Sequence, residues 1–488
     1  FWLKPLAQVI LAQAVRCSEL ESPRGEHDRR GERPGATHAG GMAGSVSFPA
    51  VPVYSRMEDD DTIAHATSDS VLTRRAPRFQ TQTITDLWRA NRKLRMLGTT
   101  SHEAGISNIH GLMSMCWNPI SILFIAFPLG IMSGIQNWGA MSTFWLNFLA
   151  LIPLAKLLGD ATEELDASLN AELLSGLINA TFGNAVEMII TVNALKANLT
   201  QVVKTSLLGS VLSNMLLVLG MSFFFGGILG TSRGAPAMHL VAEKEQRYNA
   251  DGVMCNVTML LLSSISFTLP TVFVGMGHEE HIVPLSRIGS CICMASYGAF
   301  LFFQLVTHRE MLQQGEEKGE EEEEEKGEEG PGMQMWLAMV ILFVATVCTA
   351  VSSEYLVGAV EAVVQSSSLS EAFIGVILLP IVGNACEHMA AVRFAIQDRP
   401  SLAIGIAVGS STQIALLVVP FSVLMAWAMD VDMTLDFGVL HTSVMVLSVL
   451  ILLSVVLDGR SNWLEGWMLM SAYAFIAVMY WFVQAGDL

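Results

Sequence analysis

Eleven apolar stretches, each about as long as a membrane-crossing helix, constrain what this 488-residue chain can fold into. A helix needs about 20 residues to cross the hydrocarbon core, where its backbone polar groups must bond within the segment. The chain is also 52% hydrophobic and only 15% charged, which is unusual for a soluble protein of this size. The sequence predicts an all-α polytopic membrane protein with spans at 113–133, 141–160, 173–195, 203–228, 252–275, 285–307, 334–357, 371–396, 401–429, 435–457 and 463–485.

Basic residues are concentrated in the predicted loops of one membrane side. Seven lie between 74 and 95, before the first span, and others follow the fourth, sixth, eighth and tenth spans. Cytosolic loops carry such an excess of Lys and Arg. We therefore expect a cytosolic N-terminus, and eleven crossings then place the C-terminus on the opposite side.

A short polar motif recurs 200 positions apart inside these apolar stretches. Residues 183–187 read Gly-Asn-Ala-Val-Glu, and residues 383–387 read Gly-Asn-Ala-Cys-Glu. Each copy is followed at the same distance by Gly-Ser, at 209–210 and at 409–410, which indicates an internal repeat. Five spans separate equivalent points, and an odd number of crossings reverses direction. The sequence thus predicts one extra N-terminal helix and two inverted five-helix repeats, in spans two to six and seven to eleven.

The motif carboxylates are the leading candidates for an ion or proton site. A carboxylate within a membrane span is costly, and such residues usually mark ion or proton pathways. Helical spacing places Asn184 and Thr191 on the face of Glu187, and span eight places Asn384 and His388 near Glu387 in a similar way. Carboxylate and amide oxygens suit a hard cation such as calcium. Further candidate ligands begin the following spans: Ser210, Ser410, Ser411 and Gln413.

Two other interpretations apply to parts of this constellation. Glycines at 183, 209, 383 and 409 allow close helix approach, so the polar residues could simply hold helices together. His388 is either part of a proton relay or a histidine hydrogen-bonded within the bundle. For the paired glutamates the packing interpretation is weaker, because two ionisable groups occur at equivalent positions.

Calcium and protons would compete at such a site. Two carboxylates that face each other in a dry site repel, which favours proton uptake, whereas a divalent cation favours their ionised form. This competition is the minimal physical requirement for exchange. A steep proton gradient can then drive calcium uphill, provided that more than one proton moves for each cation.

Two segments outside the apolar stretches are of low complexity or mixed charge. Residues 1–110 have the composition of a mostly disordered arm, whose apolar stretch at 1–15 is compatible with a processed start or a signal or transit sequence. Spans one to six then occupy 111–308, an acidic cytosolic linker 309–332, and spans seven to eleven 333–488. The linker is either a solvated connection or a cation-attracting regulatory segment. Its longest acidic run consists of Glu320, Glu321, Glu322, Glu323, Glu324 and Glu325.

Several classes of function are disfavoured. Five of the seven cysteines fall within predicted spans without regular spacing, so we expect free thiols. Cys386, Glu387 and His388 are consecutive, and three neighbouring helical side chains cannot readily converge on zinc or form a hydrolase site. No phosphate-binding loop supports ATP-driven pumping. We expect no enzyme activity, no cofactor and no nucleic-acid partner, with membrane lipid as the surroundings.

The motifs resemble those of the cation/proton exchangers (CAX) of the calcium/cation antiporter superfamily. The resemblance covers about residues 110–488, so it includes both halves. It is carried by Glu163-Glu164-Leu165, by 177–187 and 378–388, by the run 208–227, by Ser286-Arg287, by 303–305 with His308, and by 461–466.

The resemblance implies a calcium/proton antiporter of eleven helices with an acidic segment after the sixth, which loads calcium into an acidic vacuolar lumen. It implies that Glu187 and Glu387 are the central calcium/proton residues, and that Asn184, Asn384 and Gln413 help to form the site. Glu163 and Glu354 match acidic positions near the cytosolic and lumenal approaches. Cys386 departs from the small residues common at its position, which leaves Mn²⁺ as an alternative cargo. Sodium-coupled calcium exchange and a non-transporting calcium sensor are the remaining alternatives.

Overall fold

The computed structural model describes residues 119–168, 182–229, 244–308 and 333–483, together with Asn108 and Met115. These residues all belong to one compact unit, Phe79–Leu488. The predicted acidic linker, with Glu320–Glu325, and all of the predicted N-terminal arm except Asn108 lie outside the described residues.

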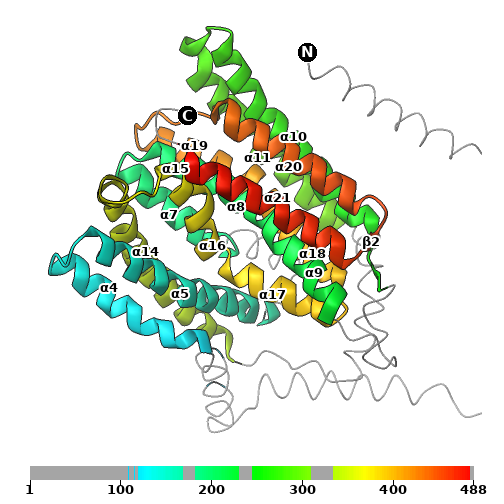
Figure 1. Ribbon diagram of the computed structural model, residues 1–488, viewed down its shortest axis with the longest axis horizontal. Helices are drawn as coiled ribbons and strands as arrows, with labels where there is room; N and C mark the ends of the chain where they lie inside the picture. Colours follow the sequence, from blue (N-terminus) through cyan, green and yellow to red (C-terminus); the bar gives the residue numbers. More distant parts are fainter. Residues whose placement is uncertain are drawn as a thin grey trace, which may run out of the picture. The chain divides into compact units, whose positions relative to one another are not determined.

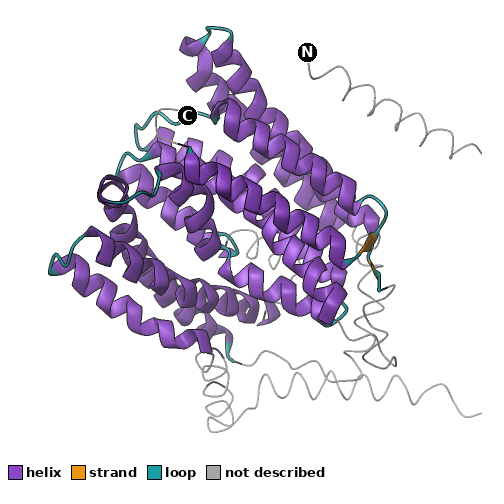
Figure 2. Ribbon diagram, in the orientation of Figure 1, coloured by secondary structure: helices purple, strands orange, loops and turns teal. Residues whose placement is uncertain are grey.

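Helices make up nearly all of the described chain (Figure 2). Two of the short turns, η1 and η3, are 3₁₀-helical, and η2, η4, η5 and η6 are π-helical. Up to residue 307 the elements are η1 (Pro119–Ile125), α4 (Ala126–Ile135), α5 (Ala140–Ser168), α7 (Ala185–Lys196), α8 (Thr200–Leu212), η2 (Ser213–Val218), α9 (Leu219–Leu229), β1 (Gln246–Arg247), α10 (Ala250–Gly275), η3 (Glu279–His281), α11 (Ile282–Phe302) and η4 (Phe303–Thr307).

The second half of the described chain continues in the same manner (Figure 1). Its elements are α14 (Met335–Ser366), α15 (Glu371–Phe373), η5 (Ile374–Leu378), α16 (Leu379–Gly383), α17 (Ala385–Ile396), α18 (Pro400–Gln413), η6 (Ile414–Val418), α19 (Val419–Ala428), α20 (Gly438–Val456), β2 (Arg460–Ser461) and α21 (Trp463–Phe482). Strands β1 and β2 pair antiparallel, with Gln246 opposite Ser461 and Arg247 opposite Arg460.

Seven described helices are long and apolar enough to cross a membrane. They are Ala140–Leu165, Thr200–Leu229, Ala250–Gly275, Glu279–Thr307, Met335–Ser366, Pro400–Ala428 and Gly438–Val456. An eighth candidate, Glu371–Ile396, is bent by 58° at a break between Gly383 and Ala385. The membrane character of the sequence is therefore retained in the fold, while the count of eleven spans stays a prediction.

The candidate span over 371–396 is broken at the second motif. The helix stops at Gly383, and Asn384 takes ψ 17°, outside the helical range, before α17 begins. Glycine is among the poorest helix formers, and asparagine prefers the position that caps a helix. Asn184 likewise precedes α7 with ψ 24°, so both motif asparagines flank helix starts instead of lying inside helices.

The 200-residue repeat extends to local structure. Helices α7, α8 and α9, with η2 before α9, follow one another as α17, α18 and α19 do with η6. The link between the first two helices contains Asn198 at φ 60° in one copy and Asp398 at φ 64° in the other. The amides of these two residues bond the carbonyls of Leu195 and Ala395, three residues earlier in each case. Equivalent sequence positions therefore adopt equivalent backbone conformations.

The two halves of the described chain interlock. Helix α9 packs on α17 and α21, and its counterpart α19 packs on α7 and α11. Helices α5 and α14 pack along each other, as do α10 and α20. At the crossing of α9 and α21, a Cβ on Gly220 or Gly466 would overlap the backbone of the other helix. Small residues permit such close approach between membrane helices.

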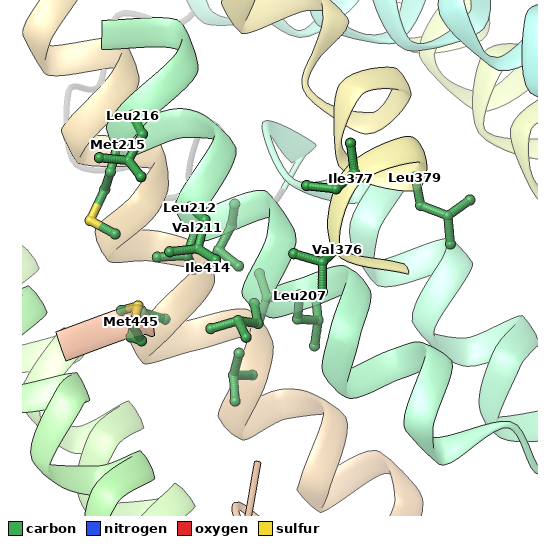
Figure 3. Packing of buried hydrophobic residues seen from close by; sticks show 14 of the residues in the cluster. Leu207, Val211, Leu212, Met215, Leu216, Val376, Ile377, Leu379, Ile414 and Met445 are labelled. Carbon is green, nitrogen blue, oxygen red and sulfur yellow. The ribbon is translucent and has the colours of Figure 1, made fainter. Parts of the chain in front are cut away.

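A large cluster of buried apolar side chains joins helices of both halves. Figure 3 shows leucine, valine, isoleucine and methionine side chains from α8, η2, η5, η6 and α20 packed together. Each is almost fully shielded from solvent, as Leu212 and Ile414 illustrate. Asn184, Glu187 and Asn384 of the motifs are themselves buried, so they lie in surroundings that offer little water.

Candidate ion-binding site

The two motif glutamates occupy matching places in the first turn of a helix. Glu187 is the third residue of α7, and Glu387 is the third residue of α17. A helix start carries unpaired amide groups and the positive end of the helix dipole, which stabilise a nearby carboxylate. The broken helices thus partly offset the cost of placing these carboxylates within the membrane.

The motif has the spacing of a helix-capping box but is not used as one. In a capping box the first side chain bonds the amide three residues on, and the glutamate bonds back. Asn462 and Glu465 form such a pair at the start of α21. Asn184 and Asn384 make no capping bond with their side chains, although a glutamate follows each at the same spacing.

The groups released from capping are buried without partners. Four oxygens have no hydrogen-bond partner: Asn184 Oδ1, Glu187 Oε1, Asn384 Oδ1 and Glu387 Oε2. A buried polar atom without a partner is costly, so a native structure retains it where a ligand or water completes the bond. Two carboxylate and two amide oxygens form the kind of donor set that a hard cation binds.

The glutamates from the two halves also approach each other. The Glu187 carboxylate is close enough to Glu387 for the two negative charges to repel. Glu187 reaches the opposite motif directly, because a Cβ added to Gly383 would lie 2.8 Å from Glu187 Oε1. Gly383 therefore leaves the space that the carboxylate of the other half occupies.

Hydrogen bonds across the halves fix both asparagine amides. Asn184 Nδ2 donates to Gln413 Oε1 at 2.7 Å, and Asn384 Nδ2 donates to the carbonyl of Ser210 at 3.2 Å. Each amide nitrogen is thus occupied, and each amide oxygen is the free end. Predicted residues Gln413 and Ser210 therefore lie beside the asparagines, with Ser210 contributing its backbone instead of its hydroxyl.

The hydroxyls of the remaining predicted ligands, Ser410 and Ser411, bond residues outside the two motifs. Ser410 Oγ accepts a bond from Asn214 Nδ2 at 2.9 Å, and Ser411 Oγ donates to the carbonyls of Val211 and Ala407. Asn214 was missed in the sequence, because Ile414 stands 200 residues later and the repeat gives no signal there. Its own Oδ1 is buried and unpartnered, so it adds a further oxygen near the crossing of α8 and α18.

His388 lies next to Glu387 but does not share its surroundings. Its Nδ1 is 2.5 Å from the carbonyl oxygen of Asn384, so it donates along its own helix. Its Nε2 is buried and unpartnered, and the ring lines an apolar groove of about 560 Å³ between α9 and α17. The structure thus shows the histidine bonded within the bundle, and leaves one nitrogen free for a relay.

The four glycines of the packing prediction differ in their surroundings. A Cβ at Gly209 would overlap the carbonyl of Val376 and the ring of Pro380, so α8 touches η5 and α16 there. At Gly409 a Cβ would meet no described residue within 4 Å. Gly183 lies in the turn before Asn184.

The two acidic approach residues lie in different settings. Glu163, on α5, is exposed and interacts electrostatically with Asp160, Lys156 and Arg393. The charge of Glu163 also acts on Cys386, the neighbour of Glu387. Glu354 is exposed on α14 and follows Ser353, which accepts a hydrogen bond from Asn193 of α7. Of the two approach residues, Glu163 is therefore the one that interacts electrostatically with a residue of the second motif.

The described cysteines are all free, as expected. Cys386 Sγ faces α5, where a Cβ on Gly159 would lie 2.6 Å away. Within the described ranges, no group of three or more His, Cys, Asp or Glu side chains is arranged to hold a metal ion. A cation at the motifs would therefore need the amide oxygens in addition to the two carboxylates.

Comparison with known proteins decides the family. The model of the sodium/calcium exchanger protein family matches residues 139–306 and 337–482, which include both motifs. The chain belongs to the sodium/calcium exchanger protein family. Members of this family are membrane transporters, so the chain is an integral membrane protein and not an enzyme.

Within the sodium/calcium exchanger protein family, the chain is similar to proteins named as cation/proton exchangers. It is 38% identical over 374 residues to vacuolar cation/proton exchanger 3 of Arabidopsis thaliana, covering 75% of this chain and 79% of that protein. It is 37% identical over 373 residues to a Ca²⁺/H⁺ antiporter of Aphanothece halophytica, covering 74% of this chain and 95% of that protein.

Solved structures agree with this placement. The structure of native YfkE matches with a TM-score of 0.62 at 35% identity, covering 75% of this chain and all of that one. An H⁺/Ca²⁺ exchanger structure, CAX, matches with a TM-score of 0.55 at 15% identity, covering 76% and 93% of the two chains. The second match supports the fold alone.

Proposed function

We propose that the protein is a calcium/proton antiporter that moves cytosolic Ca²⁺ into an acidic compartment by alternating access. The observation that carries the proposal is the set of four buried, unpartnered oxygens on two motifs 200 residues apart. Relatives named as vacuolar cation/proton exchangers support a vacuolar membrane and proton coupling. Mn²⁺, another hard cation that accepts oxygen ligands, is the alternative cargo.

Charge balance gives the exchange its mechanism. Two ionised carboxylates, Glu187 and Glu387, neutralise one divalent cation, and Asn184 Oδ1 and Asn384 Oδ1 add neutral oxygens. When the cation leaves, two protons neutralise the same pair and remove the repulsion between them. The empty, doubly ionised site is the unfavourable state, so each ion leaves most readily when the other replaces it. An acidic lumen thus favours calcium release there.

The proposal includes the inverted architecture. Eleven spans, with one extra helix before two inverted five-helix repeats, place the motifs at the interface of the halves. The matched backbone conformations at Asn198 and Asp398 and the interlocked helix pairs support this layout. Glu163 and Glu354 would serve the cytosolic and lumenal approaches. The regulatory role of Glu320–Glu325 stays a prediction outside the described residues.

Calcium-45 uptake into proteoliposomes with an acidic interior tests the function. We expect uptake by the wild type that a protonophore abolishes, and a loss of at least about tenfold in Glu187→Gln and in Glu387→Gln. Each variant removes a charged ligand, whose bonds are worth more than the roughly 1.4 kcal/mol of a tenfold change. Glu361→Gln, an exposed carboxylate on α14, is the matched control.

The same vesicles separate the alternatives. Uptake that ignores the pH gradient but follows a sodium gradient would assign the chain to sodium-coupled exchange. No uptake under either gradient would leave a calcium sensor. Full uptake by both glutamine variants would reject the carboxylate mechanism.

A further inference from the structure

The groove between α9 and α17 follows most of the length of α17. Its apolar lining consists of Met221 and Phe225 of α9 and of Met389, Val392 and Ile396 of α17. His388 lines one end, and Gln397 lines the other. These two residues are nine positions apart, which corresponds to about 14 Å at a helical rise of about 1.5 Å for each residue. One leaflet makes up half of the roughly 30 Å hydrocarbon core, so the groove is about as long as one leaflet is thick.

Both walls of the groove belong to candidate membrane spans. Helix α9 ends the span Thr200–Leu229, and α17 is the second part of the bent span that begins with α15. The two helices pack side by side (Figure 1). All five apolar residues of the lining are only half-buried, so protein leaves part of each side chain uncovered. Uncovered apolar surface of this kind marks a site of contact with a membrane or another apolar partner.

Basic side chains from two elements lie at the Gln397 end of the groove. Arg393 lines the groove, and its side chain is exposed. Lys244, which precedes β1, donates from Nζ to the carbonyl of Gly226 at 3.0 Å. Gly226 touches the same part of α17, because a Cβ added to it would lie 3.1 Å from the Cβ of Ala395. Lys244 and Arg393 therefore flank the same end of the groove.

The neighbouring acidic groups leave this end able to bind an anion. Asp398 accepts a hydrogen bond from Gln246 Nε2 at 2.7 Å. Glu163 interacts electrostatically with Arg393, but a guanidinium carries five N–H donors and can bind a phosphate as well. In the proposed topology this end faces the cytosol. Basic pockets between membrane helices on that side bind anionic lipid headgroups.

The first half of the chain has different side chains at the equivalent positions. The 200-residue offset pairs His388 with Met188 and Arg393 with Asn193. Asn193 is buried and donates from Nδ2 to the carbonyl of Ala350 at 3.0 Å, so it packs against α14. Arg393 instead stays exposed at the groove. The basic end of the groove is therefore specific to the second half and is not a consequence of the repeat.

We propose that this groove binds one anionic phospholipid of the cytosolic leaflet, with an acyl chain along the apolar lining and the phosphate on Arg393 and Lys244. The far end of the chain reaches His388, the residue after Glu387. The bound lipid thus packs on the helix that carries a motif glutamate. The choice of leaflet rests on the proposed topology, whereas binding itself requires no transport.

Thermal unfolding of the solubilised full chain with added lipid tests the proposal. We expect phosphatidylserine, and not phosphatidylcholine, to raise the Tm, because a ligand stabilises the state that it binds. In Arg393→Gln, the phosphatidylserine concentration that gives half of the Tm increase should rise by about 3- to 10-fold, the range of one net hydrogen bond. Lys196→Gln removes an exposed charge from the end of α7 and is the matched control. Its shift should stay below about twofold.

A second variant separates a lipid site from general attraction to a basic surface. Val392→Trp places a large ring in the groove and leaves Arg393 unchanged. We expect it to abolish the increase in Tm with phosphatidylserine, whereas attraction through charge alone would persist. Each increase is measured against the lipid-free Tm of the same variant, so a change in basal stability does not affect the comparison.

Four results would overturn the proposal. They are a wild-type Tm that does not respond to phosphatidylserine, an equal response to phosphatidylcholine, equal shifts in Arg393→Gln and Lys196→Gln, and an undiminished response in Val392→Trp. The first of these would mean that the groove is empty or holds a segment of this chain. Calcium uptake by the wild type, measured separately in vesicles, shows whether the proposed function fails as well.

Discussion

At the motifs, the missing side chain of Gly383 and the unpaired oxygens of Asn184 and Asn384 matter as much as the charges of the glutamates. Gly383 has no side chain, and the space that a Cβ would take is held by the Glu187 carboxylate. Asn184 and Asn384 have the type and spacing of capping residues but leave their oxygens free. The same residue type is therefore structural at Asn462 and available for a ligand at the motifs.

Gly383→Ala tests the space at the glutamate. The added Cβ would lie 2.8 Å from Glu187 Oε1, so the carboxylate must move. Overpacking of this kind costs about 1–3 kcal/mol, and we expect calcium uptake to fall about tenfold or more. Gly405→Ala on α18 is the control, because a Cβ there meets no described residue within 4 Å. Equal uptake by both alanine variants would show that the space is not needed.

Helix α17 is anchored at its end by a residue of another element. At its start it breaks from α16, and at its end the buried Gln246 of β1 anchors it. Gln246 Nε2 donates to the carbonyl of Ala395 at 2.9 Å and to Asp398 Oδ1 at 2.7 Å. Because β1 pairs with β2, this anchor joins three loops on one side of the protein. The position of Glu387 depends on a helix fixed from outside its own segment.

Gln246→Leu should loosen this element without touching the ion. The change removes the hydrogen bonds to the Ala395 carbonyl and to Asp398, each of which contributes about 0.5–1.5 kcal/mol. We expect a lower Tm in detergent by thermal unfolding. Gln397→Leu, at an exposed position of the same loop, should leave Tm unchanged. If Gln246→Leu has the same Tm as the wild type, Gln246 of β1 does not anchor α17.

At the scale of the whole molecule, the site exists only where the two halves meet. Each asparagine amide bonds a residue of the opposite half, and the equivalent helices α9 and α19 each pack on helices of the other half. A half chain would therefore present one carboxylate and lose the partner that fixes its asparagine. The proposed inverted layout suits alternating access, because the same site would open to either side.

The inversion predicts opposite sidedness for equivalent positions. Ala197 and Gln397 are both exposed and 200 residues apart, directly after α7 and α17. In sealed vesicles, a membrane-impermeant thiol reagent should label Ala197→Cys and Gln397→Cys from opposite sides, above the background of the wild-type cysteines. Labelling of both from the same side would contradict the inverted layout.

Much of the fold and the site was predictable from sequence for a simple physical reason. A bilayer requires apolar helices of a set length, so apolar stretches of that length identify candidate spans. Described helices overlap each of the expected ranges, while the count of eleven spans stays a prediction. The constant offset and the cost of intramembrane carboxylates singled out Glu187 and Glu387. The break at Asn384 was missed, although Gly383-Asn384 followed by Glu387 carries a capping signature.

The sequence by itself determined the membrane class, the repeat and the two carboxylates, because each follows from composition, length or spacing along the chain. The tertiary structure alone decided which oxygens stay free and which residues orient them. The bonds from Asn184 to Gln413 and from Asn384 to Ser210 join segments more than 100 residues apart. Which residues meet at that separation depends on how the helices cross, and local sequence patterns do not determine how helices cross.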